Sequence, residues 1–347
     1  MNILHRYIIL NFLRVFVIVI FALSSLFYII DFFNHIDLVV KYHASISELI
    51  SYFASEYPLF IYWILPIVMS LSLMISLGFL SKKNEILIMR VSGMKMINIV
   101  KPIILFSLLL VVFLFFVGEA FLPTCTAKMD YIKNVKIKKK KQMQWAKCNN
   151  IVMKTNFVDF RNNKGLNAEV YIIDKNKIIK VLKAKECMFE KNLKLLNGKQ
   201  LKIENNTISY DSFHTKTINT TFDKNLFVGS SVPVNILTLK ELIQYIKKYP
   251  SKASFYKSIL YHKITFPVSV LIVIIISIPF ILGMTERKGE FIKYTTIGML
   301  FSFAYIISCI LFLSLGKLQL LPPLLSSISP HLIFLLIATY NLIKLGE

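Results

Sequence analysis

The sequence lacks the short motifs that mark common catalytic and nucleotide-binding sites. It contains no Gly-x-x-x-x-Gly-Lys-Ser/Thr phosphate loop, no His-Glu-x-x-His zinc motif and no Gly-x-Ser-x-Gly nucleophile turn. We therefore expect no catalytic residue, no metal site and no cofactor in this chain. Any work that the protein performs must then draw its energy from a separate chain.

Cysteine and acidic residues are also scarce. The spacings of the four cysteines fit no zinc motif, and the three in one polar region (Cys125, Cys148 and Cys187) cannot all pair with one another. Lys and Arg total 41 against 19 Asp and Glu, a net charge of +22. No basic stripe with interleaved aromatic residues accompanies this charge, so we do not expect nucleic-acid binding.

Charge is missing altogether from six apolar segments: residues 15–30, 57–81, 102–118, 264–285, 294–316 and 318–343. A membrane-spanning helix needs roughly 20 mostly apolar residues, and the two shorter segments reach that length if Arg14 and Glu119 lie near their ends. No small-residue cleavage site follows the first segment, so we interpret it as a true span. The sequence predicts a polytopic α-helical membrane protein with six transmembrane helices.

Residues 124–258 differ in character, because polar residues are frequent and the apolar runs shorten to strand length. Short strands are predicted at 145–160, 168–174, 177–190, 193–204 and 206–213, with turns at Asn162–Gly165 and Asn197–Gly198. This pattern indicates an inserted all-β domain, sandwich or jelly-roll-like. The predicted organisation is helices one to three in 1–123, the β domain in 124–258 and helices four to six in 259–347. Residues 238–249 have helical spacing and lead back to the membrane.

The basic residues of the short loops predict the orientation. The N-terminus, the C-terminus and the loops at 81–101 and 285–293 carry eleven Lys and Arg, whereas the opposite loops carry only Lys41 and Lys317. The positive-inside rule then places both termini in the cytoplasm and the β domain outside. The lysine run Lys138–Lys141 in that domain is either a solvated face or a contact for anionic lipid or phosphate.

The loop from Ser81 to Gly93 is the most informative stretch. Asn84 is suited to cap a short helix over 84–92, and Gly93 is suited to end it. One side of that helix is apolar, so it lies along the membrane interface or docks on a cytoplasmic partner; we favour docking. The residues expected to couple to this partner are Glu85, Ile86, Leu87, Met89, Arg90 and Gly93.

Ionisable residues near span ends are candidates for a role in function. Glu119 lies four residues before Pro123, where it is either an interface residue or a functional one. His262 and His331 lie alone in or beside apolar spans, where packing or a satisfied hydrogen bond is expected.

The arrangement of three spans, a β domain and three more spans resembles the LptF/LptG permeases of the lipopolysaccharide export ABC transporter. Nearly the whole chain shares the likeness, most specifically at Glu85 with Gly93 and at Gly118-Glu119 with Pro123. The stretches LHRYIILNFL, SLGFLSKKNEILIMRVSG, VGEAFLP, WAKCNN, TLKELIQYIKK and LLPPLLSSISPHLIFLL look like family signatures. The GEAFLP and WAKCNN stretches favour the LptG side.

The resemblance implies a transport subunit of the bacterial inner membrane that is not itself an enzyme. In such a system the chain pairs with an LptF-like permease above a cytoplasmic LptB-like ATPase dimer. Lipopolysaccharide passes from the inner membrane into the β domains and then to LptC-like and LptA-like bridge proteins. The helix around Glu85 and Arg90 is then the coupling helix.

The lipid path is expected to involve Asp31, Asp37, Lys41, Glu119, Ile172 and Ile203. Some relatives place lysines where the first span meets the periplasm, whereas this chain has Asp31, Asn34 and Asp37 there. Two alternatives remain open from the sequence: a permease for another lipid or lipoprotein, and a membrane sensor with an external β domain.

Overall fold

The computed structural model describes residues 3–137, 144–148, 150–159, 163–174, 177–189, 192–204, 207–218, 237–286 and 291–346. Lys138–Lys141 and Lys288 lie outside these residues. The chain divides into two compact units. The first contains Met1–Asn34, Pro58–Leu122 and Leu237–Glu347, and the second contains His35–Tyr57 and Pro123–Ile236.

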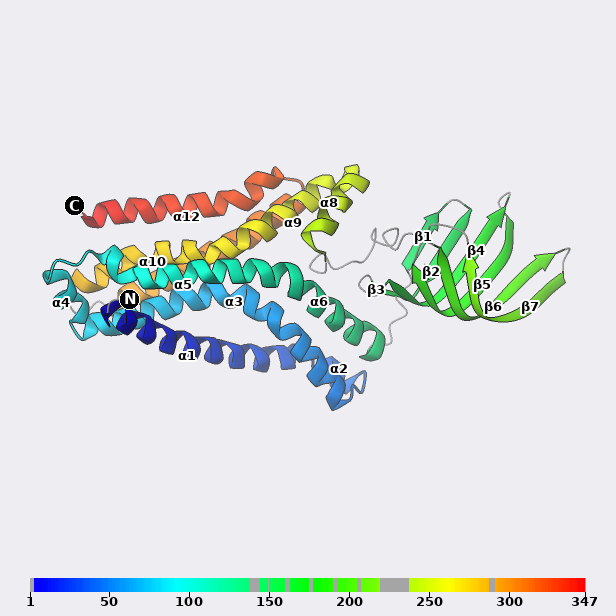
Figure 1. Cartoon of the computed structure of the whole chain (residues 1–347), viewed down its shortest axis with the longest axis horizontal. Helices are drawn as coiled ribbons and strands as arrows, with labels where there is room; N and C mark the ends of the chain where they lie inside the picture. The colour runs from blue at the N-terminus through cyan, green and yellow to red at the C-terminus, as the bar shows by residue number, and fades with distance from the viewer. Residues whose placement is uncertain are drawn as a thin grey trace. The chain divides into compact units, whose positions relative to one another are not determined.

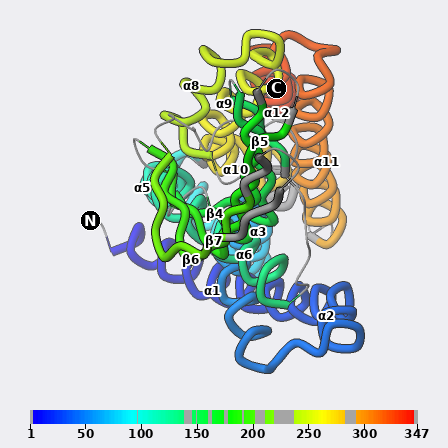
Figure 2. The backbone as a smooth tube through the Cα atoms, turned by 90° about the vertical axis from the view of Figure 1, so that its right-hand side faces the viewer, coloured from blue at the N-terminus to red at the C-terminus, as the bar shows by residue number. Residues whose placement is uncertain are grey.

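Six helices among the described residues are long and apolar enough to cross a membrane: Ile3–Asn34, Ile46–Lys82, Ile97–Ile137, Pro250–Ile281, Ile292–Lys317 and Pro323–Ile343. The six predicted spans are confirmed. Their main helices are α1 (Ile3–Asn34), α3 (Ile46–Lys82), α5 (Met96–Phe116), α9 (Ala253–Thr265), α10 (Ser269–Glu286), α11 (Phe291–Lys317) and α12 (Pro323–Gly346). Within the first unit these helices run side by side, and α11 lies against α12 (Figures 1 and 2).

The first unit is held together by an apolar core and by small polar side chains. Phe12, Met69, Leu73 and Val273 are among the core residues with no exposed surface. Ser70 Oγ lies 3.1 Å from Ser277 Oγ and 2.5 Å from Ser302 Oγ, which joins α3, α10 and α11 by hydrogen bonds. Small residues allow helices to approach closely in a membrane, where the hydrophobic effect contributes little to helix association.

Two of the spans contain irregular turns. A π-helical turn, η1 (Val117–Phe121), interrupts the third span and is followed by α6 (Leu122–Tyr131) and a second π segment, η2 (Ile132–Ile137). A 3₁₀ turn, η6 (Phe266–Val268), separates α9 from α10 and contains Pro267. Helical backbone therefore continues to Ile137, past residue 123, at which the first three predicted helices end.

The second unit contains an antiparallel sheet of seven strands. They are β1 (Gln144–Cys148), β2 (Ile151–Thr155), β3 (Phe157–Asp159), β4 (Lys164–Asp174), β5 (Lys177–Phe189), β6 (Leu193–Glu204) and β7 (Thr207–Ile218). The order is β1-β2-β4-β5-β6-β7, with β3 paired to β4. The predicted β insertion is confirmed. Its described strands form a meander, and no Greek-key crossover of the jelly-roll kind occurs among them.

The sheet bends along one line that crosses four strands, and Figure 1 shows the curvature of β6 and β7. Elsewhere, inward-facing residues recur every second position, as a pleated strand requires. At the bend, successive inward-facing residues are instead three positions apart in each strand. One row across the strands is Ala168, Ala184, Gly198 and Phe213, and the next inward row is Gly165, Cys187, Leu195 and Lys216. Asn167 and Asn197 lie between the rows with φ of 50° and 49°.

The predicted turn at Asn197–Gly198 is therefore wrong, because both residues lie inside β6. Asn tolerates positive φ better than most residues, and here it produces a bend within the strand. A Cβ on Gly198 would overlap the backbone oxygen of Lys183 and the ring of Phe213. Only glycine fits at this position without displacing the neighbouring strand β5.

Replacing Gly198 with alanine should lower the stability of the sheet by about 2 kcal/mol, since overpacking of this kind costs roughly 1–3 kcal/mol. The measurement is the thermal unfolding midpoint of the purified protein. Lys199→Ala, one residue further along β6 at an exposed position, is the control and should leave the midpoint within a degree or two. An unchanged midpoint for Gly198→Ala would contradict the close approach of Lys183 O and the Phe213 ring to Gly198.

The helical segments of the second unit have their own small core. Leu38 of α2 (Ile36–Val40), Tyr52 of α3, and Ile132 and Ile137 of η2 are buried together. Cys125, Cys187 and Cys309 are free thiols. Burial raises the pKa of the Cys187 thiol to about 12, so this residue is a poor nucleophile at neutral pH.

Candidate functional site

The loop between α3 and α5 contains a short helix, α4 (Glu85–Val91), as the sequence predicted. Its C-terminus follows the Schellman pattern, in which Gly93 N–H donates to Arg90 O at 2.9 Å and Met94 N–H to Met89 O at 3.1 Å. Gly93 has φ of 89°, a backbone conformation that is strained for residues with a side chain. The predicted cap by Asn84 is wrong. Asn84 has φ of 59°, and its side chain makes no capping hydrogen bond to the described residues.

The two faces of α4 differ from the expectation. Ile86 and Met89 are buried in the core of the first unit, at 0% and 8% exposure. Leu87, Ile88 and Val91 are exposed at 40%, 65% and 81%. Three exposed apolar side chains on one short helix are typical of a surface that a partner or the membrane interface covers. Leu87, Ile88 and Val91 therefore form the exposed apolar surface of α4, whereas Ile86 and Met89 attach α4 to its own chain.

Charged residues lie within α4 and close to it in the sequence. Tyr7 Oη of α1 donates a hydrogen bond of 2.7 Å to Glu85 Oε2. Arg90 is half-buried, whereas Lys82, Lys83, Lys95 and Lys101 are exposed. The sequence offered no signal for the Tyr7 contact, because 78 residues separate the partners. Glu85 consequently helps to fix the position of α4 against α1, in addition to any contact with a partner.

Glu119 lies in the π-helical turn η1 and binds two groups from a distant part of the first unit. Its carboxylate accepts hydrogen bonds from the Leu239 N–H at 2.9 and 3.1 Å. The Lys263 ammonium lies 3.1 Å from Glu119 Oε2 and also donates to Leu237 O at 2.9 Å. π-helical turns occur frequently at functional sites, since they redirect one side chain without ending the helix. Here the turn ties the third span to the chain that enters the fourth.

Glu119 contacts the N-terminus of helix α8 (Leu239–Lys248). Thr238 and Glu241 form a capping box there, in which the Thr238 side chain accepts from Glu241 N–H and the Glu241 carboxylate accepts from Thr238 N–H. A carboxylate at this end also interacts favourably with the helix dipole. The Thr-x-x-Glu spacing was visible in the sequence, whereas the partnership with Glu119 was not.

The other lipid-path candidates have different surroundings. Asp31 is buried on α1, Asp37 lies in the first turn of α2, and the Lys41 ammonium lies 5.8 Å from the centre of the Tyr42 ring. Ile172 of β4 is half-buried and packs at the edge of the sheet core. Ile203 lies in β6, but its side chain is outside the described part of the chain.

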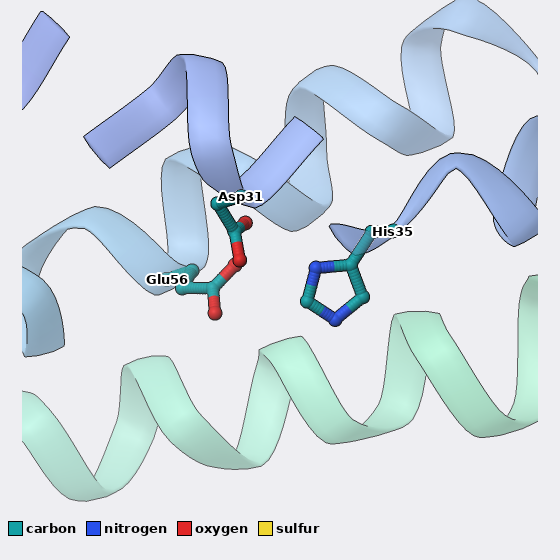
Figure 3. Close-up of side chains that lie close together, drawn as sticks. All are labelled: Asp31, His35 and Glu56. Carbon is teal, nitrogen blue, oxygen red and sulfur yellow. The ribbon is translucent and has the colours of Figure 1, made fainter. Parts of the chain in front are cut away.

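A polar cluster in the second unit was missed from the sequence. His35 Nε2 accepts a hydrogen bond from Lys133 at 2.9 Å and lies 3.3 Å from Tyr52 Oη. A His35 nitrogen and a Glu56 carboxylate oxygen lie within 4.8 Å of each other; Figure 3 draws both with Asp31, which belongs to the first unit. Two ligand atoms within one unit do not define a metal site, and we assign none.

The two span histidines are packed inside the first unit. His331 Nδ1 and Tyr305 Oη lie 2.7 Å apart, and the His262 ring stacks on Trp63 with centroids 5.9 Å apart. Nε2 of each histidine is buried without a hydrogen-bond partner among the described residues. The hydrogen bond expected for a buried histidine is therefore present for His331, and His262 is held by ring contacts.

Six apolar helices with an antiparallel sheet inserted between the third and the fourth define a multi-pass membrane protein. The family model described as lipopolysaccharide export system permease LptF/LptG matches residues 6–344. The chain therefore belongs to the LptF/LptG permease family. A comparison with curated proteins finds no match.

Proposed function

We propose that this chain is an LptG-like subunit of an ABC transporter that extracts lipopolysaccharide from the inner membrane. The family is a permease family, so the chain is a transport protein and not an enzyme. The match over residues 6–344 carries the proposal, because it includes both the membrane helices and the sheet. ATP hydrolysis then takes place in an LptB-like dimer, with an LptF-like permease beside this chain.

The exposed apolar face of α4 supports the coupling part of this proposal. Leu87, Ile88 and Val91 form a small apolar surface on a loop with several exposed lysines. An ATPase with an apolar groove and an acidic rim would match both features. In this scheme Glu85 and Arg90 lie at the edge of the interface and Gly93 ends the helix.

The sheet is proposed to carry acyl chains towards LptC-like and LptA-like bridge proteins. Its apolar face includes Met153, Val170, Leu182 and Leu195, and Ile172 lies at the margin of that face. A photo-crosslinker at Ile172 should capture lipopolysaccharide during ATP-driven transport. Lys147, exposed on β1, is the control position and should give far less product. Equal capture at both positions, or none at Ile172, would argue against a carrier role for the sheet.

The proposed orientation places both termini and α4 in the cytoplasm. A cysteine introduced at Lys288 should be protected from an impermeant thiol reagent in cells with a permeabilised outer membrane, while one at Asn163 should react. Labelling of both samples after detergent lysis is the control for reactivity. Reaction at Lys288 with protection at Asn163 would reverse the orientation.

A further inference from the structure

The bend of the sheet forms one wall of a cleft that the proposed export path does not use. The cleft has a volume of about 700 Å³. It is lined by Lys154, Asn156, Asn167, Ala168, Glu169, Lys183, Ala184, Lys185, Asn197, Gly198, Lys199, Ser212, Phe213 and His214. These residues come from β2, β4, β5, β6, β7 and the turn before β3, so the cleft crosses the sheet along the bend.

Three rows of residues explain how the cleft forms. The middle row contains Ala168, Ala184 and Gly198, which face the inward side of the sheet and so present only backbone to the cleft. The row on one side contains Glu169, Lys183 and Lys199, and the row on the other side contains Asn167, Lys185 and Asn197. The long polar side chains on the outer face thus stand on both sides of a row that contributes no side chain to that face.

The charge of the lining is positive, with four lysines against one glutamate. That glutamate is already engaged, since Glu169 lies 3.1 Å from Lys183 and 3.5 Å from Lys154 and accepts a hydrogen bond of 2.7 Å from Tyr171 Oη. The Tyr171 hydrogen bond, followed by Lys183, holds the pKa of Glu169 below its usual value. Lys185 and Lys199 have no acidic partner within ion-pair distance in the described part of the sheet.

The uncharged lining is suited to hydroxyl groups. Asn156, Asn167 and Asn197 offer amide donors and acceptors, and Ser212 offers a hydroxyl. The volume falls within the range of roughly 300–1,000 Å³ that is typical of small-molecule sites. Lysine binds phosphate as a point charge, whereas the amides match the several hydroxyls of a sugar.

We propose that this cleft binds a phosphorylated saccharide, with Lys185 and Lys199 at the phosphate and the three asparagines at the sugar hydroxyls. The proposal does not rest on the export function, because the same chemistry is found in soluble sugar phosphates and in the head groups of glycolipids. It also gives a role to the two left-handed asparagines, whose side chains the bend brings to the cleft.

The test uses the full-length chain in nanodiscs, with glucose 1-phosphate, glucose and inorganic phosphate as soluble probes and lipid A as the membrane probe. Lys185→Met and Lys199→Met keep the apolar stem and remove one charge each; Lys147→Met removes an equal charge outside the cleft. Lys185→Arg is the conservative variant. Binding is measured by calorimetry at low and at high salt.

We expect Lys185→Met and Lys199→Met each to lower the affinity for the phosphorylated sugar about tenfold. Lys147→Met should change this affinity less than twofold, and Lys185→Arg should retain most of it. The affinity should fall as salt rises. Binding of glucose 1-phosphate identifies a soluble source, and binding of lipid A alone identifies a glycolipid source; either supports the proposal. Failure of both probes, equal binding of glucose, or affinity independent of Lys185 and Lys199 overturns it.

Discussion

Replacing Ile88 with aspartate should strongly weaken the association of this chain with the proposed LptB-like ATPase while leaving membrane insertion normal. Ile88 is 65% exposed at the centre of the apolar surface that also contains Leu87 and Val91. A buried anchor in an interface contributes about 2 kcal/mol or more, and a charge in its place adds a desolvation cost. A loss of at least 30-fold in affinity is therefore expected, since each 1.4 kcal/mol corresponds to about tenfold.

The measurement is a pull-down of the ATPase, normalised to the amount of each variant in the membrane. Leu318→Asp is the matched control, because Leu318 is 68% exposed and directly follows the C-terminal end of α11. Tyr7→Phe separates the internal contact of Glu85 from any contact with the ATPase: it removes the 2.7 Å hydrogen bond and keeps the carboxylate. If Ile88→Asp retains the ATPase as well as Leu318→Asp does, α4 is not the docking surface.

Glu119→Ala should destabilise the first unit by about 2 kcal/mol without affecting ATPase association. The substitution removes the acceptor of the Leu239 N–H and leaves the Lys263 ammonium without its carboxylate. Hydrogen bonds to charged groups contribute roughly 1.5–3 kcal/mol. The two side chains are 30% and 18% exposed, so the cost stays below the roughly 3–5 kcal/mol of a fully buried pair.

Thermal unfolding of three variants separates the contributions at Glu119. Glu119→Gln keeps an acceptor for the Leu239 N–H and should lose only part of the stability. The double variant Glu119→Ala, Lys263→Ala should be more stable than Glu119→Ala alone, because it leaves no largely buried ammonium without a carboxylate. If all three variants unfold at the parent temperature, the contact between η1 and α8 does not stabilise the protein.

The spans and the β insertion were predictable because each depends on local composition. Segments without charge identify the six helices, and Gly93 marks the end of α4, since only a residue that tolerates positive φ fits there. The strands followed from short apolar runs. These signals extend over a few neighbouring residues and need no knowledge of the tertiary structure.

The contacts of the site were not predictable, because they join residues far apart in the chain. An amphipathic helix has an apolar stripe, but the sequence does not say which part of it the chain's own core covers. Ile86 and Met89 were assigned to the partner for this reason, whereas α4 buries them in its own chain. Tyr7 with Glu85 and Glu119 with Lys263 are likewise distant pairs.

The sheet bend was missed for a related reason. Asn197-Gly198 has the composition of a hairpin turn, and in isolation that prediction is reasonable. The pairing of Gly198 with Ala184 on one side and Phe213 on the other keeps this pair inside β6. The neighbouring strands, and not the local sequence, decide between a turn and a bend.

The most direct test of the proposed export function is mass spectrometry of the lipid that copurifies with the chain and the proposed LptB-like ATPase. The family assignment and the proposed path predict lipopolysaccharide, retained without nucleotide and released during ATP hydrolysis in the presence of the bridge proteins. Lys82→Ala, at an exposed lysine beside α4, should copurify the same lipid. A different lipid or lipoprotein in the complex, or lipopolysaccharide absent from an intact complex, would contradict the account.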